Sequence, residues 1–262
     1  MTKFHSMVKP WLLIVALLVP SSLQAQASER EPLVTDRPDF TESAVTVGTG
    51  RVQLEGGYTL ARVDDLTEHA LGEVLLRIGL GPRAELRLAP GSFVWTEGDT
   101  DDASGLDDGT LGAKLVLAAP PGARGLRPAA ALLLSTSVPT GAAAFGENAW
   151  QPEAKLALAW ELSDRLALAA NVGAAAASEA GERFGQGTGS LTAALALTPR
   201  LGGYVEGYGF LPAGPDGADA GYLNSGLTLL FGPDVQLDAR IGIGFSAAEP
   251  DVFLGVGASR RW

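Results

Sequence analysis

The segment Asp251–Trp262 reads DVFLGVGASRRW, and the alternation of its side chains decides the fold. Successive side chains of an extended strand point to opposite faces. One face of this segment therefore carries Val252, Leu254, Val256, Ala258 and Trp262. The other face carries Phe253, Gly255, Gly257, Ser259 and Arg261. This pattern predicts a two-faced β-strand with one mostly apolar face.

This segment, which ends in an aromatic residue, resembles the closing strand of bacterial outer-membrane β-barrels. The resemblance implies that Leu254, Val256 and Trp262 form the assembly signal that the barrel insertion machinery reads. Arg260 departs from an all-apolar face, at the depth where lipid headgroups would lie. The alternative interpretation is an edge strand of a soluble β-sandwich.

The N-terminus has the features of a secretory signal peptide. Lys3 and Lys9 precede a short apolar run from Trp11 to Val19, and Ala25-Gln26-Ala27 fits a small-x-small cleavage pattern. We therefore expect residues 1–27 to be cleaved and residues 28–49 to form a polar periplasmic extension. The apolar run is too short to span a membrane, and no run of about 18 apolar residues follows it. Any membrane span must then be built from strands.

Composition narrows the classes of function. The formal net charge is -11, and cleavage after Ala27 removes two lysines and no acids, which leaves -13. An acidic chain argues against nucleic acid as a partner. The sequence has no cysteine, which excludes disulfides and thiolate metal sites. We expect neither a metal nor a cofactor.

From Arg51 onward, alternating segments are separated by connections of two kinds. Four are short and rich in tight-turn residues, namely Gly81-Pro82-Arg83, Ser163-Asp164-Arg165, Thr198-Pro199-Arg200 and Gly232-Pro233-Asp234. Longer polar connections alternate with the short ones, as in transmembrane barrels with short periplasmic turns and long outer loops. We therefore predict an all-β fold in which residues 50–262 form an up-and-down antiparallel transmembrane β-barrel of about 12 strands. The expected strands are roughly 51–62, 69–80, 84–95, 108–118, 127–138, 151–162, 166–177, 188–198, 201–210, 221–231, 235–245 and 251–262.

The expected strands have the length that a membrane requires. Ten to twelve residues at about 3.3 Å each, tilted by roughly 40°, cover about 25–30 Å along the barrel axis. The apolar band of such barrels is about 25 Å tall, so outer-membrane lipid and lipopolysaccharide are expected partners. Pro90 predicts an interruption of the third strand, because proline cannot donate to the strand ladder. Aromatic residues near strand ends predict interfacial girdles at Trp95, Trp150, Phe210, Tyr222 and Phe245 on the outer side and Phe231 and Trp262 on the inner side.

If the apolar faces meet lipid, the polar faces line the lumen. The candidate lumen-lining residues are Arg51, Gln53, Glu55, Glu73, Arg77, Glu85, Arg87, Lys114, Lys155, Tyr204, Glu206, Tyr208, Asp238 and Arg240. Twelve strands give a Cα diameter of roughly 24 Å, which leaves about 10 Å once side chains are placed. This predicts a narrow channel for a small-molecule solute, with selectivity set by those charges. The alternative is an occluded barrel whose interior charges only satisfy each other.

The stretch TDRPDFTES at residues 35–43, followed by VQLEGGYT at residues 52–59, is specific enough to suggest a family. It resembles a bacterial outer-membrane β-barrel family of proposed transporters, assigned to the MetA-pathway of phenol degradation. Beyond residue 59 the resemblance rests on patterns such as GLDDGTLGAK at Gly105–Lys114 and SVPTG at Ser137–Gly141. It implies a barrel that imports hydrophobic or aromatic compounds.

The resemblance also implies a role for the segment before the barrel. Asp36, Arg37 and Asp39 would form a periplasmic mouth or gate, with Arg37 tucked into the lumen and paired with Glu55 or another inward acid. The alternative is a strand-entry linker with local salt bridges.

The predicted function is passive uptake of small solutes, including aromatic or hydrophobic ones, across the bacterial outer membrane. One alternative is a non-transporting structural or surface-interaction barrel, and another is an outer-membrane lipid hydrolase. Hydrolysis of that kind needs a serine hydroxyl beside a histidine base. His69 is the one histidine after residue 27, and the sequence shows no serine partner for it. We therefore predict a protein that is not an enzyme.

Overall fold

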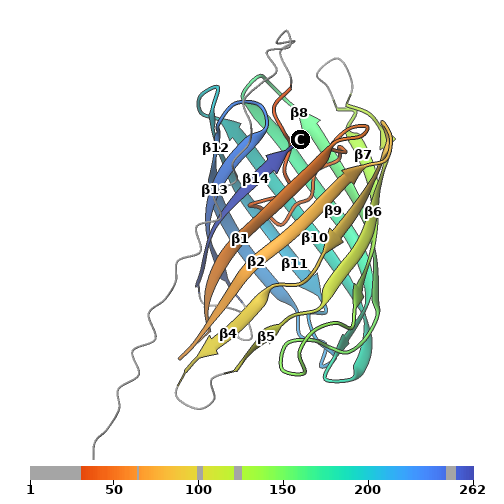
Figure 1. Cartoon of the computed structure of the whole chain (residues 1–262), viewed down its shortest axis with the longest axis vertical. Helices are drawn as coiled ribbons and strands as arrows, with labels where there is room; N and C mark the ends of the chain where they lie inside the picture. Colours follow the sequence, from red (N-terminus) through yellow and green to blue (C-terminus); the bar gives the residue numbers. More distant parts are fainter. Residues whose placement is uncertain (1–30, 64, 99–102, 121–125, 246–251) are drawn as a thin grey trace, which may run out of the picture. The chain divides into compact units, whose positions relative to one another are not determined.

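The computed structural model describes residues 31–63, 65–98, 103–120, 126–245 and 252–262. The expected signal peptide, residues 1–27, lies outside the described residues. Within them, 14 strands form one antiparallel sheet, which closes into a barrel because β1 (Val52–Val63) pairs with β14 (Val252–Arg261) (Figure 1). The ring of strands that this pairing closes has no free edge, so its backbone polar groups are paired within the barrel wall, as a lipid environment requires.

The described strands make 12 crossings, because two crossings are each interrupted. β3 (Ala84–Ala89) and β4 (Phe93–Glu97) both pair with β2 (Leu66–Gly79), and Pro90 lies in the gap, as the sequence predicts. β5 (Ser104–Leu106) pairs with β4, and β6 (Gly109–Ala118) pairs with β3. The predicted up-and-down barrel of 12 antiparallel strands is therefore confirmed.

The other crossings are single strands that pair in sequence order. They are β7 (Ala129–Val138), β8 (Gln151–Glu161), β9 (Leu166–Glu179), β10 (Glu182–Ala196), β11 (Leu201–Leu211), β12 (Ala220–Leu230) and β13 (Val235–Gly244). β10 begins six residues before its predicted start at 188. The reason is a tight turn at Ala180 and Gly181, with φ of 50° and 83°, which replaces the expected longer loop.

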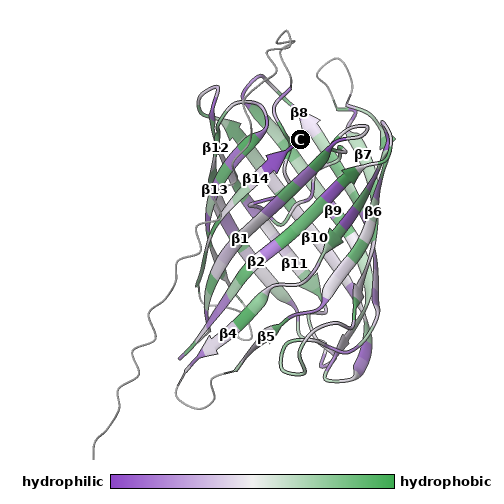
Figure 2. Ribbon diagram, viewed as in Figure 1, coloured by the Kyte–Doolittle hydropathy of each residue, from purple (hydrophilic) through white to green (hydrophobic). Residues whose placement is uncertain are grey.

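The barrel is apolar outside and polar inside. Leu54, Leu115 and Leu156 are 40%, 41% and 38% exposed on the outer face, whereas Arg77 and Lys114 are fully buried. Figure 2 shows the same alternation as bands of apolar and polar residues along the strands. A water-soluble domain has the opposite arrangement, so the barrel belongs in the bacterial outer membrane. The described residues contain no helix of the length and apolarity needed to cross a bilayer.

The two ends of the barrel differ in their connections. The short turns at residues 80–83, 162–165, 197–200 and 231–234 lie where β1 begins and β14 ends. Longer connections, such as residues 139–150 and 212–219, lie at the other end. Short turns are periplasmic in this class of barrel, so we refer to the first end as periplasmic and to the second as outer.

Candidate functional site

Residues 31–49, which we call the lumenal segment, run inside the barrel before β1 begins (Figure 1). Five side chains of this segment are buried, namely Leu33, Asp36, Thr41, Ala44 and Val47. Wall side chains hold the segment mainly through ion pairs and hydrogen bonds, described below. The segment therefore fills part of the lumen that the sequence predicts to be a narrow channel.

Small side chains of β7 and β8 make room for the segment. Ala44 is 2% exposed and packs in a cluster with Ala129, Ala131, Leu133 and Ala157. The sequence around β7 is apolar on both faces, so its inward side could not be recognised by pattern. The contact with Ala44 explains why an inward-facing position of this strand is apolar: it meets protein instead of water.

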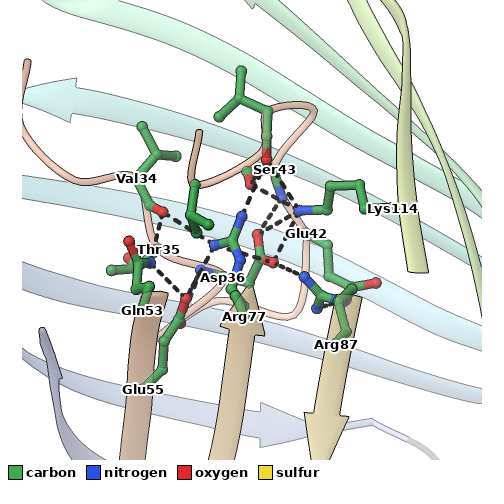
Figure 3. A network of polar contacts seen from close by, with 12 residues as sticks. Val34, Thr35, Asp36, Glu42, Ser43, Gln53, Glu55, Arg77, Arg87 and Lys114 are labelled. Atoms are coloured by element: carbon green, nitrogen blue, oxygen red, sulfur yellow. Dashed lines mark hydrogen bonds and ion pairs between the residues drawn. The ribbon is translucent and has the colours of Figure 1, made fainter. Parts of the chain in front are cut away.

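Asp36 is the centre of a buried ionic network (Figure 3). Its Oδ2 atom accepts from Arg87 Nη1 at 2.5 Å and from Lys114 Nζ at 3.0 Å, and it lies 3.4 Å from Arg77 Nη1. Its Oδ1 atom accepts from the backbone N–H of Ser43 at 2.7 Å. Three cations from β2, β3 and β6 thus converge on one carboxylate of the lumenal segment.

The wall acids of the same network bind the backbone of the segment. Arg77 pairs with Glu55 at 3.0 Å and with Glu85 at 2.9 Å. Glu55 accepts from the N–H of Asp36 at 3.0 Å, and Glu85 accepts from the N–H of Val47 at 2.9 Å. These carboxylates satisfy N–H groups that would otherwise be buried without a partner.

Arg37 binds the part of the wall formed by β1, β2, β13 and β14. Its guanidinium pairs with Glu73 at 2.7 Å and with Asp238 at 3.5 Å, so its partners are inward acids other than Glu55. Two glycines provide the space, because a Cβ on Gly57 would lie 2.3 Å from Arg37 Nη2 and a Cβ on Gly257 would lie 2.5 Å from Nε. The wall is therefore shaped to receive this side chain.

Residues 40–42 of the lumenal segment bind the wall through two further carboxylates, one from the wall and one from the segment. Glu206 accepts from the N–H of Phe40 at 2.8 Å, the N–H of Thr41 at 2.7 Å and the Thr41 hydroxyl at 2.6 Å. Glu42 pairs with Arg87 at 2.5 Å and with Lys155 at 2.9 Å. The backbone of Glu42 also exchanges two hydrogen bonds with the Asn171 side chain. Sequence reasoning gave no site role to Phe40, Thr41 or Glu42, although all three stand in the TDRPDFTES motif.

The acids of the segment respond differently to this environment. Burial alone would raise the pKa of Asp36, but Arg77, Lys114 and Arg87 outweigh it and hold that pKa well below its usual range. Lys155 and Arg87 likewise outweigh burial at Glu42 and lower its pKa. For Asp39, burial comes first and the neighbouring Glu206 carboxylate second, and together they raise the pKa well above its usual range. Asp36 and Glu42 therefore favour docking as anions, and Asp39 favours it in the protonated form.

Aromatic rings line the lumen beside the segment. Phe40 lies parallel to Tyr208, with ring centroids 4.4 Å apart and an angle of 8°, and Tyr208 stacks on Tyr222 at 4.5 Å. Phe210 meets the Phe40 ring edge-on at 5.5 Å. The expected outer girdle is therefore wrong for Phe210 and Tyr222, which point inward. They were placed by their position near strand ends, whereas their even-numbered positions share the inward face of Tyr208 on β11 and of Asn224 on β12.

The structure places most expected lumen residues inside the barrel, buried or half-buried. These are Gln53, Glu55, Glu73, Arg77, Glu85, Arg87, Lys114, Lys155, Tyr204, Glu206, Tyr208, Asp238 and Arg240. Arg51 lies at the periplasmic rim beside Gly48. A cavity of about 140 Å³ remains between the segment and the wall, lined in part by Glu42, Arg87 and Lys155.

Comparison with known families identifies the chain. A family model described as "Putative MetA-pathway of phenol degradation" matches residues 35–262, which include the lumenal segment and the whole barrel. The chain belongs to this family. A comparison with curated proteins found no match.

This member of the MetA-pathway family is similar in fold to solved outer-membrane barrels. It is similar to the crystal structure of an outer membrane channel from Pseudomonas putida F1, with 16% identity, a TM-score of 0.62, and coverage of 91% of this chain and 100% of that one. It is also similar to the NanC porin (9% identity, TM-score 0.53) and to the KdgM porin in complex with disordered oligogalacturonate (10% identity, TM-score 0.52). Each of these two covers 80% of this chain and 98% of its own. At such identities the likeness shows the fold alone.

The outer face of this MetA-pathway barrel carries the remaining predicted residues. Leu254, Val256 and Trp262 are 47%, 55% and 51% exposed, and the Trp262 backbone N–H bonds to Val52 at the barrel closure. Their role as an assembly signal stays a prediction. His69 packs between Trp95, with ring centroids 4.5 Å apart, and Tyr58, whose hydroxyl lies 2.6 Å from His69 Nδ1.

Proposed function

We propose that this barrel is a channel for passive uptake of small aromatic solutes across the outer membrane, and that the lumenal segment gates it. The observation that carries the proposal is the way in which the segment is held. Ion pairs of Asp36, Arg37 and Glu42 hold the segment on the wall. No disulfide ties it there, because the chain has no cysteine. Such a plug can leave the lumen without unfolding the strands.

Two further observations support a channel. The inward rings of Tyr208, Phe210 and Tyr222 present flat apolar faces to a polar lumen, which is the combination that small-molecule sites commonly use. The structural relatives include a protein described as an outer membrane channel and two porins. The hydrolase alternative loses support, because the Nδ1 atom of His69 lies beside a tyrosine hydroxyl on the lipid-facing side.

Conductance in planar lipid bilayers tests the proposal. The full mature chain is compared with a variant that lacks residues 31–47, with reconstitution and heat-dependent migration in gels as evidence of folding. We expect low conductance from the full chain and a severalfold higher conductance after deletion. The deleted segment carries four acids and one arginine, so deletion raises the formal net charge of the chain by three and should shift the ion selectivity toward anions. A folded deletion variant with no solute flux would leave the non-transporting structural barrel as the function.

A further inference from the structure

The lumenal segment presents a ring and a carboxylate two residues apart to one wall of the lumen. The Phe40 ring lies flat on Tyr208 and edge-on to Phe210, and Lys155 Nζ lies 5.2 Å from its centroid. The Glu42 carboxylate lies between the same Lys155 at 2.9 Å and Arg87 at 2.5 Å. One ammonium group therefore contacts both the ring and the acid.

The wall residues that make these contacts form a site with defined chemistry. A parallel ring partner and an edge-on ring partner favour a flat aromatic ligand over a saturated one of equal size. A lysine and an arginine that converge on one carboxylate favour an anion, and charge-assisted hydrogen bonds to a carboxylate are stronger than neutral ones. When the segment leaves, Tyr208 and Phe210 lose a ring neighbour, and Lys155 and Arg87 each lose an anionic partner.

A cavity lies against this site while the segment is docked. The cavity of about 140 Å³ lies against Glu42, Arg87 and Lys155, and Thr110, Ser135 and Glu153 also line it. This volume is large enough for several water molecules. A carboxylate that enters the cavity would meet the two cations directly and compete with Glu42 for them.

We propose that the Phe40 ring and the Glu42 carboxylate mimic a planar aromatic carboxylate, and that a solute of this class binds the same wall residues and displaces the lumenal segment. This inference rests on the proposed channel and names its solute class. The solute itself would then open the channel, because a ligand shifts the equilibrium between docked and undocked segment toward the state to which it binds more tightly. A neutral phenol lacks the anion, and an aliphatic carboxylate lacks the ring, so each should act weakly.

A single reporter cysteine measures displacement of the segment. Ala44→Cys is the only cysteine in that chain, and position 44 is 2% exposed while the segment is docked. The rate at which a polar maleimide modifies it, in protein reconstituted into vesicles, reports the undocked fraction. The ligands are benzoate, cyclohexanecarboxylate, phenol and acetate at equal concentrations. If Ala44→Cys does not give a heat-modifiable barrel, Val45→Cys in the same segment serves as the reporter.

We expect saturating benzoate to accelerate modification about tenfold or more and the other three ligands to change the rate less than about twofold. Tyr208→Leu should abolish the benzoate effect, whereas Tyr58→Leu on the outer face should preserve it. Equal acceleration by benzoate and cyclohexanecarboxylate, no benzoate effect, or an intact effect in Tyr208→Leu would each overturn the inference. If the deletion variant conducts but benzoate does not change the modification rate, only this inference is refuted. A barrel that never conducts but responds to benzoate refutes only the channel.

Discussion

Replacing Asp36 by asparagine should release the lumenal segment at neutral pH. The substitution preserves size and an oxygen that can accept the Ser43 N–H, but it removes the negative charge that faces Arg87, Lys114 and Arg77. All three cations would then lose their shared anion while the segment stays docked. The segment can avoid this cost by leaving the lumen, where water can hydrate the cations.

The size of the effect follows from the burial of the network. The Asp36 side chain is 2% exposed, and the side chains of Arg77 and Lys114 are 0% exposed. Removing one member of a buried ion pair typically costs about 3–5 kcal/mol. We take the lower value, about 3 kcal/mol of docking free energy, because asparagine retains one hydrogen bond and Arg77 keeps two other acids as partners. A loss of this size corresponds to a roughly 100-fold rise in the undocked fraction.

The modification rate of Ala44→Cys measures this change directly, because it scales with the undocked fraction as long as docking is fast. The matched control is Asp219→Asn, which removes the same charge from an exposed position between β11 and β12. We expect the control to match the parent within a factor of two. An Asp36→Asn variant that folds as a barrel but whose rate rises less than threefold would refute the view that this ionic network holds the segment.

Three further outcomes follow from the structure. Asp39→Asn should tighten docking and slow the modification of Ala44→Cys at pH 7, because the raised pKa of Asp39 means that docking favours its protonated form. The difference between variant and parent should vanish below about pH 4, where Asp39 of the parent is protonated both docked and undocked. The lowered pKa values of Asp36 and Glu42 mean that their contribution to docking is fully present above the ordinary pKa of about 4 and is lost as the pH falls through the lowered values. Bilayer conductance of the parent should therefore rise in strong acid and fall again on return to pH 7. Val172→Arg, at a position 64% exposed midway along β9, should lower the free energy of unfolding in vesicles by about 2–4 kcal/mol, whereas Ala218→Arg in an outer loop should change it little; equal effects would argue against a lipid-facing β9.

Local patterns in the sequence predicted much of this protein. The alternation around Leu54 and Leu254 assigns a lipid face, because side chains of a strand alternate strictly and the outer-membrane barrel inverts the usual burial. Pro90 predicted the interruption between β3 and β4, since proline lacks the donor that the ladder needs. The same alternation, applied to β11 and β12, places Phe210 and Tyr222 in the lumen, whereas their nearness to strand ends suggested an outer girdle.

The position of the lumenal segment was decided only by the tertiary structure. Residues 31–49 have no sustained period, so no local rule states whether they lie beneath the barrel, outside it or within it. Arg37 meets both Glu73 of β2 and Asp238 of β13 because closure pairs β1 with β14 and so brings β2 and β13 to the same side of the lumen. The sequence by itself therefore determined which side chains face inward. Closure of the barrel determined which of them meet, because pairing across a lumen depends on the positions of strands far apart in the chain.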